Sequence, residues 1–201
     1  SASTGWLRYA TTNPGTCNDT FGTRAPTSGG TTLGSGASAV PFSQTVTTLV
    51  AGTTYYFCAL AGSPAGTSFG AVLSLTTLSA PATTTLAATA LADTSATLNG
   101  SVNANGSDTT AWFRYATTSP GTCNDTFGTR FPTSGGAQLP ASATSVTFAQ
   151  SLSGLRAGTT YYYCAIASNT VGTGVGAVLT FTTSADAPTV ITLPPTDVLV
   201  S

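Results

Sequence analysis

Cysteine has the most reactive side chain in this sequence, and it occurs at four positions: Cys17, Cys58, Cys123 and Cys164. A thiolate can act as a nucleophile, bind a soft metal ion or join a second thiol in a disulfide. The spacing argues against a zinc site, because the chain has neither a C-x-x-C motif nor a histidine. Covalent cross-linking is therefore the chemistry that these residues best support.

General acid–base catalysis lacks its usual side chains, because the chain contains no His, Glu, Lys or Met. The carboxylates belong to six scattered aspartates: Asp19, Asp93, Asp108, Asp125, Asp186 and Asp197. A calcium ion wants six or more oxygen ligands and usually several carboxylates, so a lone aspartate does not build such a site. We expect no enzyme activity, no catalytic or metal-binding residues and no cofactor.

Charged residues make up 5% of the chain, and the net charge is −1. An average soluble domain carries roughly 25% charged residues. A chain with so little charge has no long-range field that would attract nucleic acid or an anionic membrane. No apolar run approaches the roughly 20 residues of a membrane-spanning helix. We expect neither a nucleic-acid partner nor a membrane span.

The chain is internally duplicated. Residues 6–77 align with residues 112–183 without a gap, and 45 of the 72 aligned positions are identical. A duplication of this extent indicates a tandem array of one module. Residues 81–106 precede the second copy and have no counterpart before the first, whereas residues 187–201 resemble residues 80–94. We expect an incomplete module at 1–79, a complete module at 80–185, and a C-terminal strand segment at 186–201 that begins or completes another module.

Short runs with strand-like alternation recur along both copies, and nothing in the pattern indicates a helix. In one such run, Ala96, Leu98 and Val102 share a face. The predicted strands are Trp6–Thr12, Ala39–Thr47, Thr53–Gly62, Phe69–Thr77, Thr83–Thr89, Ser95–Val102, Thr109–Thr118, Ser145–Leu152, Thr159–Ser168 and Val175–Thr183. Short alternating strands separated by turns predict an all-β antiparallel sandwich.

The run Leu155–Asn169 (LRAGTTYYYCAIASN) resembles the E–F corner and strand F of a fibronectin type III domain, and Leu49–Tyr55 is its first copy. Residues 96–102 resemble strand B of that fold, residues 112–115 strand C, and residues 176–183 strand G. The likeness covers nearly the whole chain and is greatest to Thr- and Gly-rich modules of secreted microbial surface proteins. It implies two tandem fibronectin type III-like sandwiches, the first without its own A and B strands, but no activity.

The resemblance also assigns roles to two tyrosines and to the cysteines. Tyr55 and Tyr161 match the tyrosine corner, whose hydroxyl bonds to nearby backbone. One cysteine of each module falls in the loop after strand C and the other on strand F, which neighbour each other in this sandwich. The resemblance therefore implies the disulfides Cys17–Cys58 and Cys123–Cys164. Buried free thiols and cross-links between chains are the alternatives. Disulfides indicate an oxidising compartment, so we expect an extracellular or cell-surface location.

The longest unbroken identity between the copies is a loop, Pro14–Arg24, repeated at Pro120–Arg130. This loop is either a binding or subunit-contact loop, or the result of a recent duplication and the geometry that a disulfide demands. Trp6 and Trp112, with the tyrosines three residues after them, are either an aromatic strip for sugars or core residues of strand C. Strand alternation predicts that the neighbouring Arg8 and Arg114 are exposed.

Four N-x-S/T sequons offer glycosylation sites, at Asn18, Asn99, Asn105 and Asn124. Because Thr-rich chains produce such sequons by chance, plain surface asparagines are the alternative.

The first module is expected to have an open face, because strand E would stand without strands A and B and one side of the core would meet water. The C-terminal segment has the opposite problem, since its strand-prone residues have no domain of their own. These candidate donor-strand residues are Val190, Ile191, Leu193, Val198, Leu199 and Val200. An acceptor and a donor on one chain indicate head-to-tail assembly by strand addition. A longer covalent array of modules is the competing arrangement.

The sequence thus predicts an extracellular structural protein, namely a subunit or segment of a filament or stalk. Its expected partners are copies of itself or covalent neighbouring repeats, and surface glycans are a further candidate. The alternative function is an adhesin or carbohydrate-binding stalk module of a larger secreted protein or enzyme.

Overall fold

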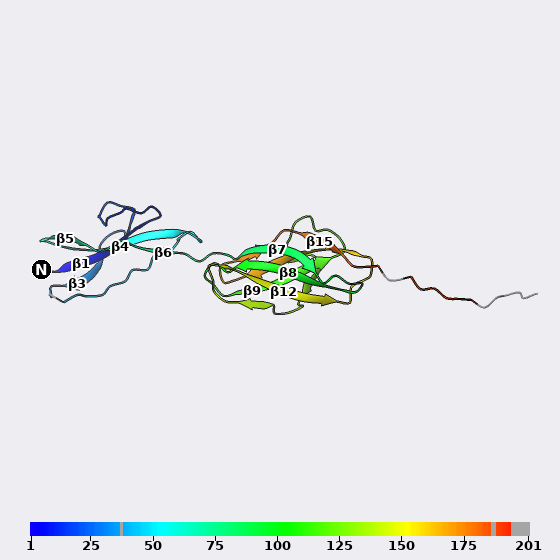
Figure 1. The fold of residues 1–201 in the computed structure, drawn as a ribbon. Coiled ribbons are helices and arrows are strands. Elements are labelled where there is room, and N and C mark those ends of the chain that lie inside the picture. The colour runs from blue at the N-terminus through cyan, green and yellow to red at the C-terminus, as the bar shows by residue number, and fades with distance from the viewer. Residues whose placement is uncertain (37, 186–187, 194–201) are drawn as a thin grey trace, which may run out of the picture.

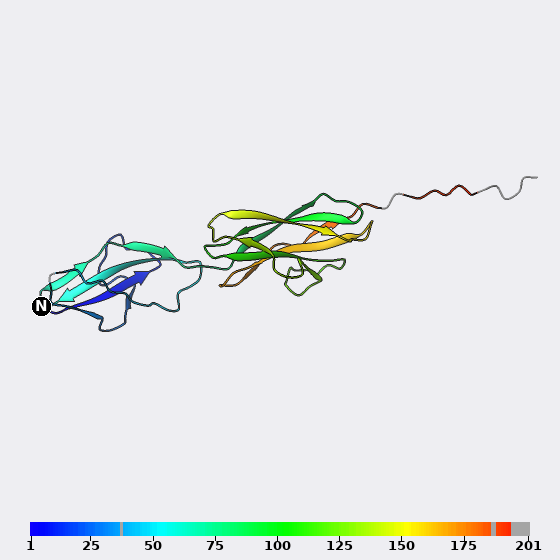
Figure 2. The same ribbon diagram turned by 90° about the horizontal axis from the view of Figure 1, so that it is seen from below.

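A computed structural model of the protein describes residues 1–36, 38–185 and 188–193. All of the regular elements in these ranges are β-strands, and they form two groups that lie end to end along the chain (Figures 1 and 2). The first group lies within residues 3–76 and the second within residues 82–182. Within these ranges there is no helix with the length and hydrophobicity that a membrane span requires.

The second module is a sandwich of two antiparallel sheets. Its strands are β7 (Ala82–Thr89), β8 (Ser95–Asn103), β9 (Thr109–Ala116), β10 (Thr129–Phe131), β11 (Ala137–Leu139), β12 (Ser145–Ser153), β13 (Thr160–Ser168), β14 (Thr173–Val175) and β15 (Leu179–Thr182). One sheet has the order β12-β8-β7, and the other has β10-β9-β13-β14 with β11 on β9 and β15 on β13. These are strands E-B-A packed against C, F and G, so the predicted fibronectin type III-like sandwich is confirmed for this module.

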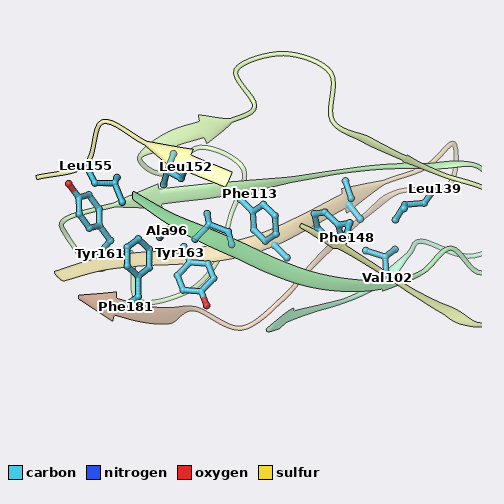
Figure 3. Packing of buried hydrophobic residues seen from close by; sticks show 14 residues of the cluster. Ala96, Val102, Phe113, Leu139, Phe148, Leu152, Leu155, Tyr161, Tyr163 and Phe181 are labelled. Atoms are coloured by element: carbon cyan, nitrogen blue, oxygen red, sulfur yellow. The ribbon is translucent and has the colours of Figure 1, made fainter. Parts of the chain in front are cut away.

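The core of the second module lies between these two sheets (Figure 3). Leu98 and Val102 of β8 face Phe113 of β9 and Tyr163 of β13, and all four side chains are buried. Alternation places every second residue of β8 in this core, because successive side chains of a strand point to opposite faces. The face shared by Ala96, Leu98 and Val102 is therefore confirmed.

The first module is a single sheet. Its strands are β1 (Ser3–Ala10), β2 (Thr23–Ala25), β3 (Thr31–Gly34), β4 (Thr54–Ser63), β5 (Gly66–Phe69) and β6 (Leu73–Thr76). They repeat the C-F-G sheet of the second module, with β4 beside β1 as β13 is beside β9. Among the described residues no strand corresponds to β7 or β8, as the sequence predicted.

The predicted strand Ala39–Thr47 is wrong, because residues 39–47 form no strand. The corresponding segment of the second module is β12, which pairs with β8 at nine positions from Ser145↔Asn103 to Ser153↔Ser95. A strand needs a ladder partner to satisfy its backbone groups. Alternation alone does not supply that partner, and no described residue of the first module does either.

Strand G is interrupted in both modules, where the sequence predicted one continuous strand. β14 and β15 flank the break in the second module, and β5 and β6 flank it in the first. At the break, the N–H of Gly176 donates to the carbonyl of Ala165 at 2.9 Å, and Gly70 repeats this bond to Ala59 at 2.8 Å. The break leaves a gap in the hydrogen-bond ladder beside β13 in the second module and beside β4 in the first.

The junction between the modules is held by side chains of the second one. Asn105 Nδ2 donates to the carbonyl of Ala80 at 2.7 Å, and Asn169 Nδ2 donates to that of Ser79 at 2.9 Å. These two bonds fix the linker where it enters β7.

Candidate functional site

The inner face of the first module is the strongest candidate site. Leu7 and Tyr9 of β1, Tyr55 and Phe57 of β4 and Leu75 of β6 line a cavity of about 250 Å³ together with Gln44, Val46 and Leu49 of the irregular segment that precedes β4. The segment 39–50 lies along this face without joining the sheet. A concave, mainly apolar surface of this size is large enough to receive side chains from another polypeptide.

The second module shows what normally covers this face. Phe113, Tyr163 and Phe181 occupy the positions of Leu7, Phe57 and Leu75, and all three are buried beneath β7 and β8. Leu75 is 44% exposed, whereas its counterpart Phe181 is 5% exposed. The first module therefore keeps the apolar residues of a core without the second sheet that would bury them.

The segment after the second module is apolar and unpacked. Val190, Ile191 and Leu193 are 90%, 80% and 77% exposed. Residues 188–193 extend away from the second sandwich without joining a sheet (Figures 1 and 2). The other three candidate donor residues, Val198, Leu199 and Val200, lie outside the described residues.

The outer face of each sheet carries the disulfide. Cys17–Cys58 and Cys123–Cys164 are both formed, each with Cα atoms 6.0 Å apart, so the pairing implied by the resemblance is confirmed. Free thiols are absent among the described residues. In the first module Trp6, Cys58 and Leu60 form a small buried cluster beneath the disulfide loop, and the second module repeats it. The disulfide thus closes a second, smaller core on the side opposite the open face.

An aspartate anchors the disulfide loop to the sheet. Asp19 Oδ1 accepts hydrogen bonds from Trp6 Nε1 at 2.9 Å and from Arg8 Nε at 3.0 Å. Asp125 repeats both bonds, to Trp112 at 2.8 Å and to Arg114 at 3.0 Å. The expectation that the two arginines are simply exposed is wrong, because each side chain is 17% exposed and forms an ion pair with the loop.

A second arginine stacks its guanidinium over the ring of each tryptophan. The guanidinium carbon of Arg24 lies 4.8 Å from the centroid of the Trp6 ring, and that of Arg130 lies 4.6 Å from Trp112. Arg24 also donates to the carbonyls of Pro26 and Gly29, which fixes the following turn. Both tryptophans are buried, so they do not form an exposed aromatic strip. These contacts give the repeated loop a structural role in both modules.

Burial of Asp19 acts to raise the pKa of its carboxyl, but the hydrogen bonds from Trp6 and Arg8 and the charges of Arg8 and Arg24 outweigh it, so this pKa is lowered. A lowered carboxyl pKa stabilises the folded state above the ordinary aspartate range and loses that effect as the pH falls through the folded-state value. We expect the thermal stability of the first module to fall below about pH 4. We also expect Asp19→Asn to make that decline shallower.

Thermal melts of the wild type and of Asp19→Asn between acid and neutral pH, followed by near-ultraviolet circular dichroism, measure how the stability of each declines with pH. Parallel declines in melting temperature would contradict the assigned role of Asp19. The matched variant at the second loop, Asp125→Asn, controls for the contribution of the other module.

Both predicted tyrosine corners are formed. The Tyr55 hydroxyl accepts from the N–H of Val50 at 3.0 Å, and the Tyr161 hydroxyl accepts from that of Arg156 at 2.9 Å. These bonds tie the start of β4 and of β13 to the preceding corner.

The four sequons differ in how their side chains are used. Asn99 Nδ2 donates to the carbonyl of Ala87 at 2.8 Å, and Asn105 Nδ2 holds the linker, so a sugar at either position would compete with these bonds. Asn18 Nδ2 makes one longer bond, to Thr16 at 3.3 Å, and Asn124 repeats it. Glycosylation stays a prediction, and at Asn18 and Asn124 the modified nitrogen would affect only this longer bond, because the Oδ1 atoms accept the others.

No group of three or more His, Cys, Asp or Glu side chains in the described part of the chain could hold a metal ion. Asp19 and Asp125 instead anchor the two disulfide loops.

Comparison with protein-family models finds no match to this chain, and neither does comparison with curated proteins. Among solved structures, the sensor domain of the anti-sigma factor RsgI4 of Pseudobacteroides cellulosolvens is similar over 57% of this chain and 99% of its own, at 15% identity and a TM-score of 0.35. The FN1–FN3 domains of chicken CNTN1 are similar over 90% of this chain and 56% of theirs, at 14% identity and a TM-score of 0.35. At this level of likeness neither protein bears on the function of this chain.

Proposed function

We propose that this chain is a non-catalytic structural subunit or segment of an extracellular filament or stalk, in which β-sandwich modules are joined head to tail. The segment after the second module of one copy completes the first module of the next. The observation that carries this proposal is the inner face lined by Leu7, Phe57 and Leu75, which the irregular segment 39–50 covers only in part. Exposed apolar faces of this kind are rare on soluble monomers and mark interaction sites.

The same chain also carries a segment suited to that face. Residues 187–193 (APTVITL) resemble residues 80–86 (APATTTL), which lead into and form the first half of β7. β7 is the strand that covers the equivalent face of the second module. Strand addition of this kind gains affinity from main-chain hydrogen bonds and specificity from alternate side chains. A donor and an acceptor at different places on one chain give a heterologous contact, which propagates into a filament.

The residues that hold the linker on the second module are not repeated in the first. Asn169 and Gly174 contact the linker where it enters the second module. A Cβ at Gly174 would lie 3.0 Å from the carbonyl carbon of Pro81 and closer still to its oxygen. The first module has Ser63 and Ser68 at these positions. A strand that covers the first module therefore cannot enter along the path that the linker takes into the second module.

The two disulfides support an extracellular location, because such bonds persist in oxidising compartments. Solvent-facing Trp6 and Trp112 would favour the adhesin alternative, and both rings are buried. Sugars on Asn18 and Asn124 would lie on the outer face, away from the proposed contact.

Electron microscopy of the purified chain under non-reducing conditions tests the proposal, with a chain truncated after Ala187 beside it. We expect long regular fibres from the intact chain and single short particles from the truncated one. Single particles from both proteins would contradict a self-assembling filament. Fibres from both would show that another part of the chain makes the contact.

A further inference from the structure

We infer that, in the filament proposed above, the tail strand docks on the first module of the next copy in the register of β7, with the Thr192 hydroxyl accepting a hydrogen bond from the Ala59 N–H beside Gly70. This inference rests on the proposed function and adds the register and the anchoring contact. It is drawn from the way the second module holds its own β7.

In the second module a threonine of β7 fills the gap in the ladder beside β13. The Thr85 Oγ1 accepts a hydrogen bond from the N–H of Ala165 at 3.0 Å, and the Thr85 side chain is buried. The neighbouring Gly176 admits the strand, because a Cβ there would lie 2.5 Å from the Thr85 nitrogen and closer to its Oγ1. Docking of a strand beside β13 in this way thus requires both a threonine on that strand and a glycine on the receiving sheet.

The first module repeats the receiving half of this arrangement. Ala59 and Gly70 occupy the positions of Ala165 and Gly176, and the Gly70 N–H donates to the Ala59 carbonyl at 2.8 Å. No side chain of the described residues accepts from the Ala59 N–H in the way that Thr85 accepts from Ala165.

The first module itself restricts position 70 less than the second module restricts position 176. The nearest atoms to a Cβ at Gly70 all belong to Ala59, and the closest is its oxygen at 3.2 Å. The backbone of Gly70 does not have the positive φ that favours glycine. The space that the missing side chain leaves is the space that an incoming strand would use.

The segment 188–193, here called the tail, supplies the threonine of this arrangement. Aligning Pro188 with Pro81 places Thr192 at the position of Thr85 and Val190 at that of Thr83. The Thr83 Oγ1 is buried without a hydrogen-bond partner in the second module. An unsatisfied buried hydroxyl is costly, and valine has nearly the same shape without it. Val190 therefore removes this unsatisfied hydroxyl, while Ser68, which replaces Gly174, requires a shift of the strand at the same position.

Two differences separate the docked strand from β7. Ser68 stands where the second module has Gly174, so the tail has to shift from the path of β7 at Pro188 and at Val190. Phe57 replaces Tyr163, whose hydroxyl donates to the Leu86 carbonyl at 2.7 Å, so the carbonyl of Leu193 lacks that bond. Both differences weaken the contact relative to a strand within one chain, which fits association between separate copies.

Three glycine variants of the full chain test the register. Gly70→Ala should abolish fibres in electron microscopy with only a small fall in the melting temperature of the unassembled chain, because the nearest atom to the new methyl group is the Ala59 oxygen at 3.2 Å. Gly176→Ala should instead lower the melting temperature, because the new methyl group meets β7 of the same chain. Gly36→Ala should change neither, since no atom lies within 4 Å of its Cβ position.

A second pair of variants lies in the tail, where folding of the modules is not affected. Thr192→Val should raise the critical concentration for assembly about tenfold by leaving the Ala59 N–H unpaired, and Thr192→Ser should restore it. Normal fibres from both Gly70→Ala and Thr192→Val would overturn this register and leave the filament in place. Failure of the wild-type chain to assemble would instead overturn the proposed function.

Discussion

Replacing Phe148 by alanine is expected to lower the free energy of unfolding of the second module by about 3–5 kcal/mol. The Phe148 ring lies on Phe113, with centroids 4.8 Å apart and an interplanar angle of 24° (Figure 3). It also covers Gly100 of β8, where a Cβ would lie 2.5 Å from Phe148 Cε1. Removing the ring leaves a cavity between the two sheets that neither Gly100 nor Phe113 can fill, because both belong to rigid ladders.

The duplication provides a matched control at Phe42, which occupies the same position in the first module. Phe42 lies over Gly5 of β1, where a Cβ would be 2.9 Å from its Cε1, but it is only half-buried. No second sheet formed by the described residues packs on the ring, so Phe42→Ala removes less buried area and leaves no enclosed cavity. We expect a loss of about 1 kcal/mol from the first module.

Hydrogen exchange followed by mass spectrometry measures both effects, because peptides from residues 1–77 and 82–183 report on the modules separately. Equal losses at Phe42 and Phe148 in the unassembled chain would show that the inner face of the first module is already covered. That result would remove the main observation behind strand donation.

Much of the fold could be predicted from the sequence because the strands obey local rules. Alternation in β8 and the repeated tyrosine corners depend on residues close together in the chain, and both are confirmed. The disulfides followed from knowing which strands are neighbours, so they needed the family resemblance as well as the spacing. The uncovered face followed from the phase of the repeat, since the segment that forms β7 and β8 has one copy.

The features that could not be predicted from the sequence depend on contacts between residues distant in the chain. Residues 39–47 alternate like a strand, yet they form none, because the ladder partner β8 has no counterpart in the first module. The residues next to Asp19 in the sequence do not distinguish it from other loop aspartates. Its partners Trp6 and Arg8 lie 13 and 11 residues away in the chain. The one available signal was that Asp19 and both of its partners are retained in the second copy at the same spacing.

Loss of the first disulfide is expected to have the largest effect on the first module. The bond closes a loop of 41 residues, which corresponds to about 4 kcal/mol on the chain-entropy model. A small domain is stable by only about 5–15 kcal/mol in total. The first module lacks the core between two sheets, and its described buried cluster, Trp6 with Cys58 and Leu60, lies beneath the disulfide loop itself. We therefore expect Cys17→Ala combined with Cys58→Ala to unfold this module at room temperature.

The corresponding double variant of the second module should behave differently. Cys123→Ala with Cys164→Ala removes a bond of the same span, but the core around Phe113 and Tyr163 remains. We expect this module to stay folded with a lower melting temperature. Hydrogen exchange distinguishes the two outcomes, since the first variant should lose protection throughout β1 and β4 and the second should keep it in β9 and β13. Retained protection in β1 and β4 would contradict the view that the outer-face cluster holds the first module together.

The same pair of variants connects stability to assembly. The proposed receiving face, with Ala59 and Gly70, belongs to the module that depends on the Cys17–Cys58 bond. The variant without this bond should therefore fail to form fibres, whereas the variant without Cys123–Cys164 should still form them, because its tail and its receiving face are both intact. Fibres from the first variant would mean that the incoming strand can fold the first module without the disulfide, and that strand addition contributes more stability than the covalent bond does.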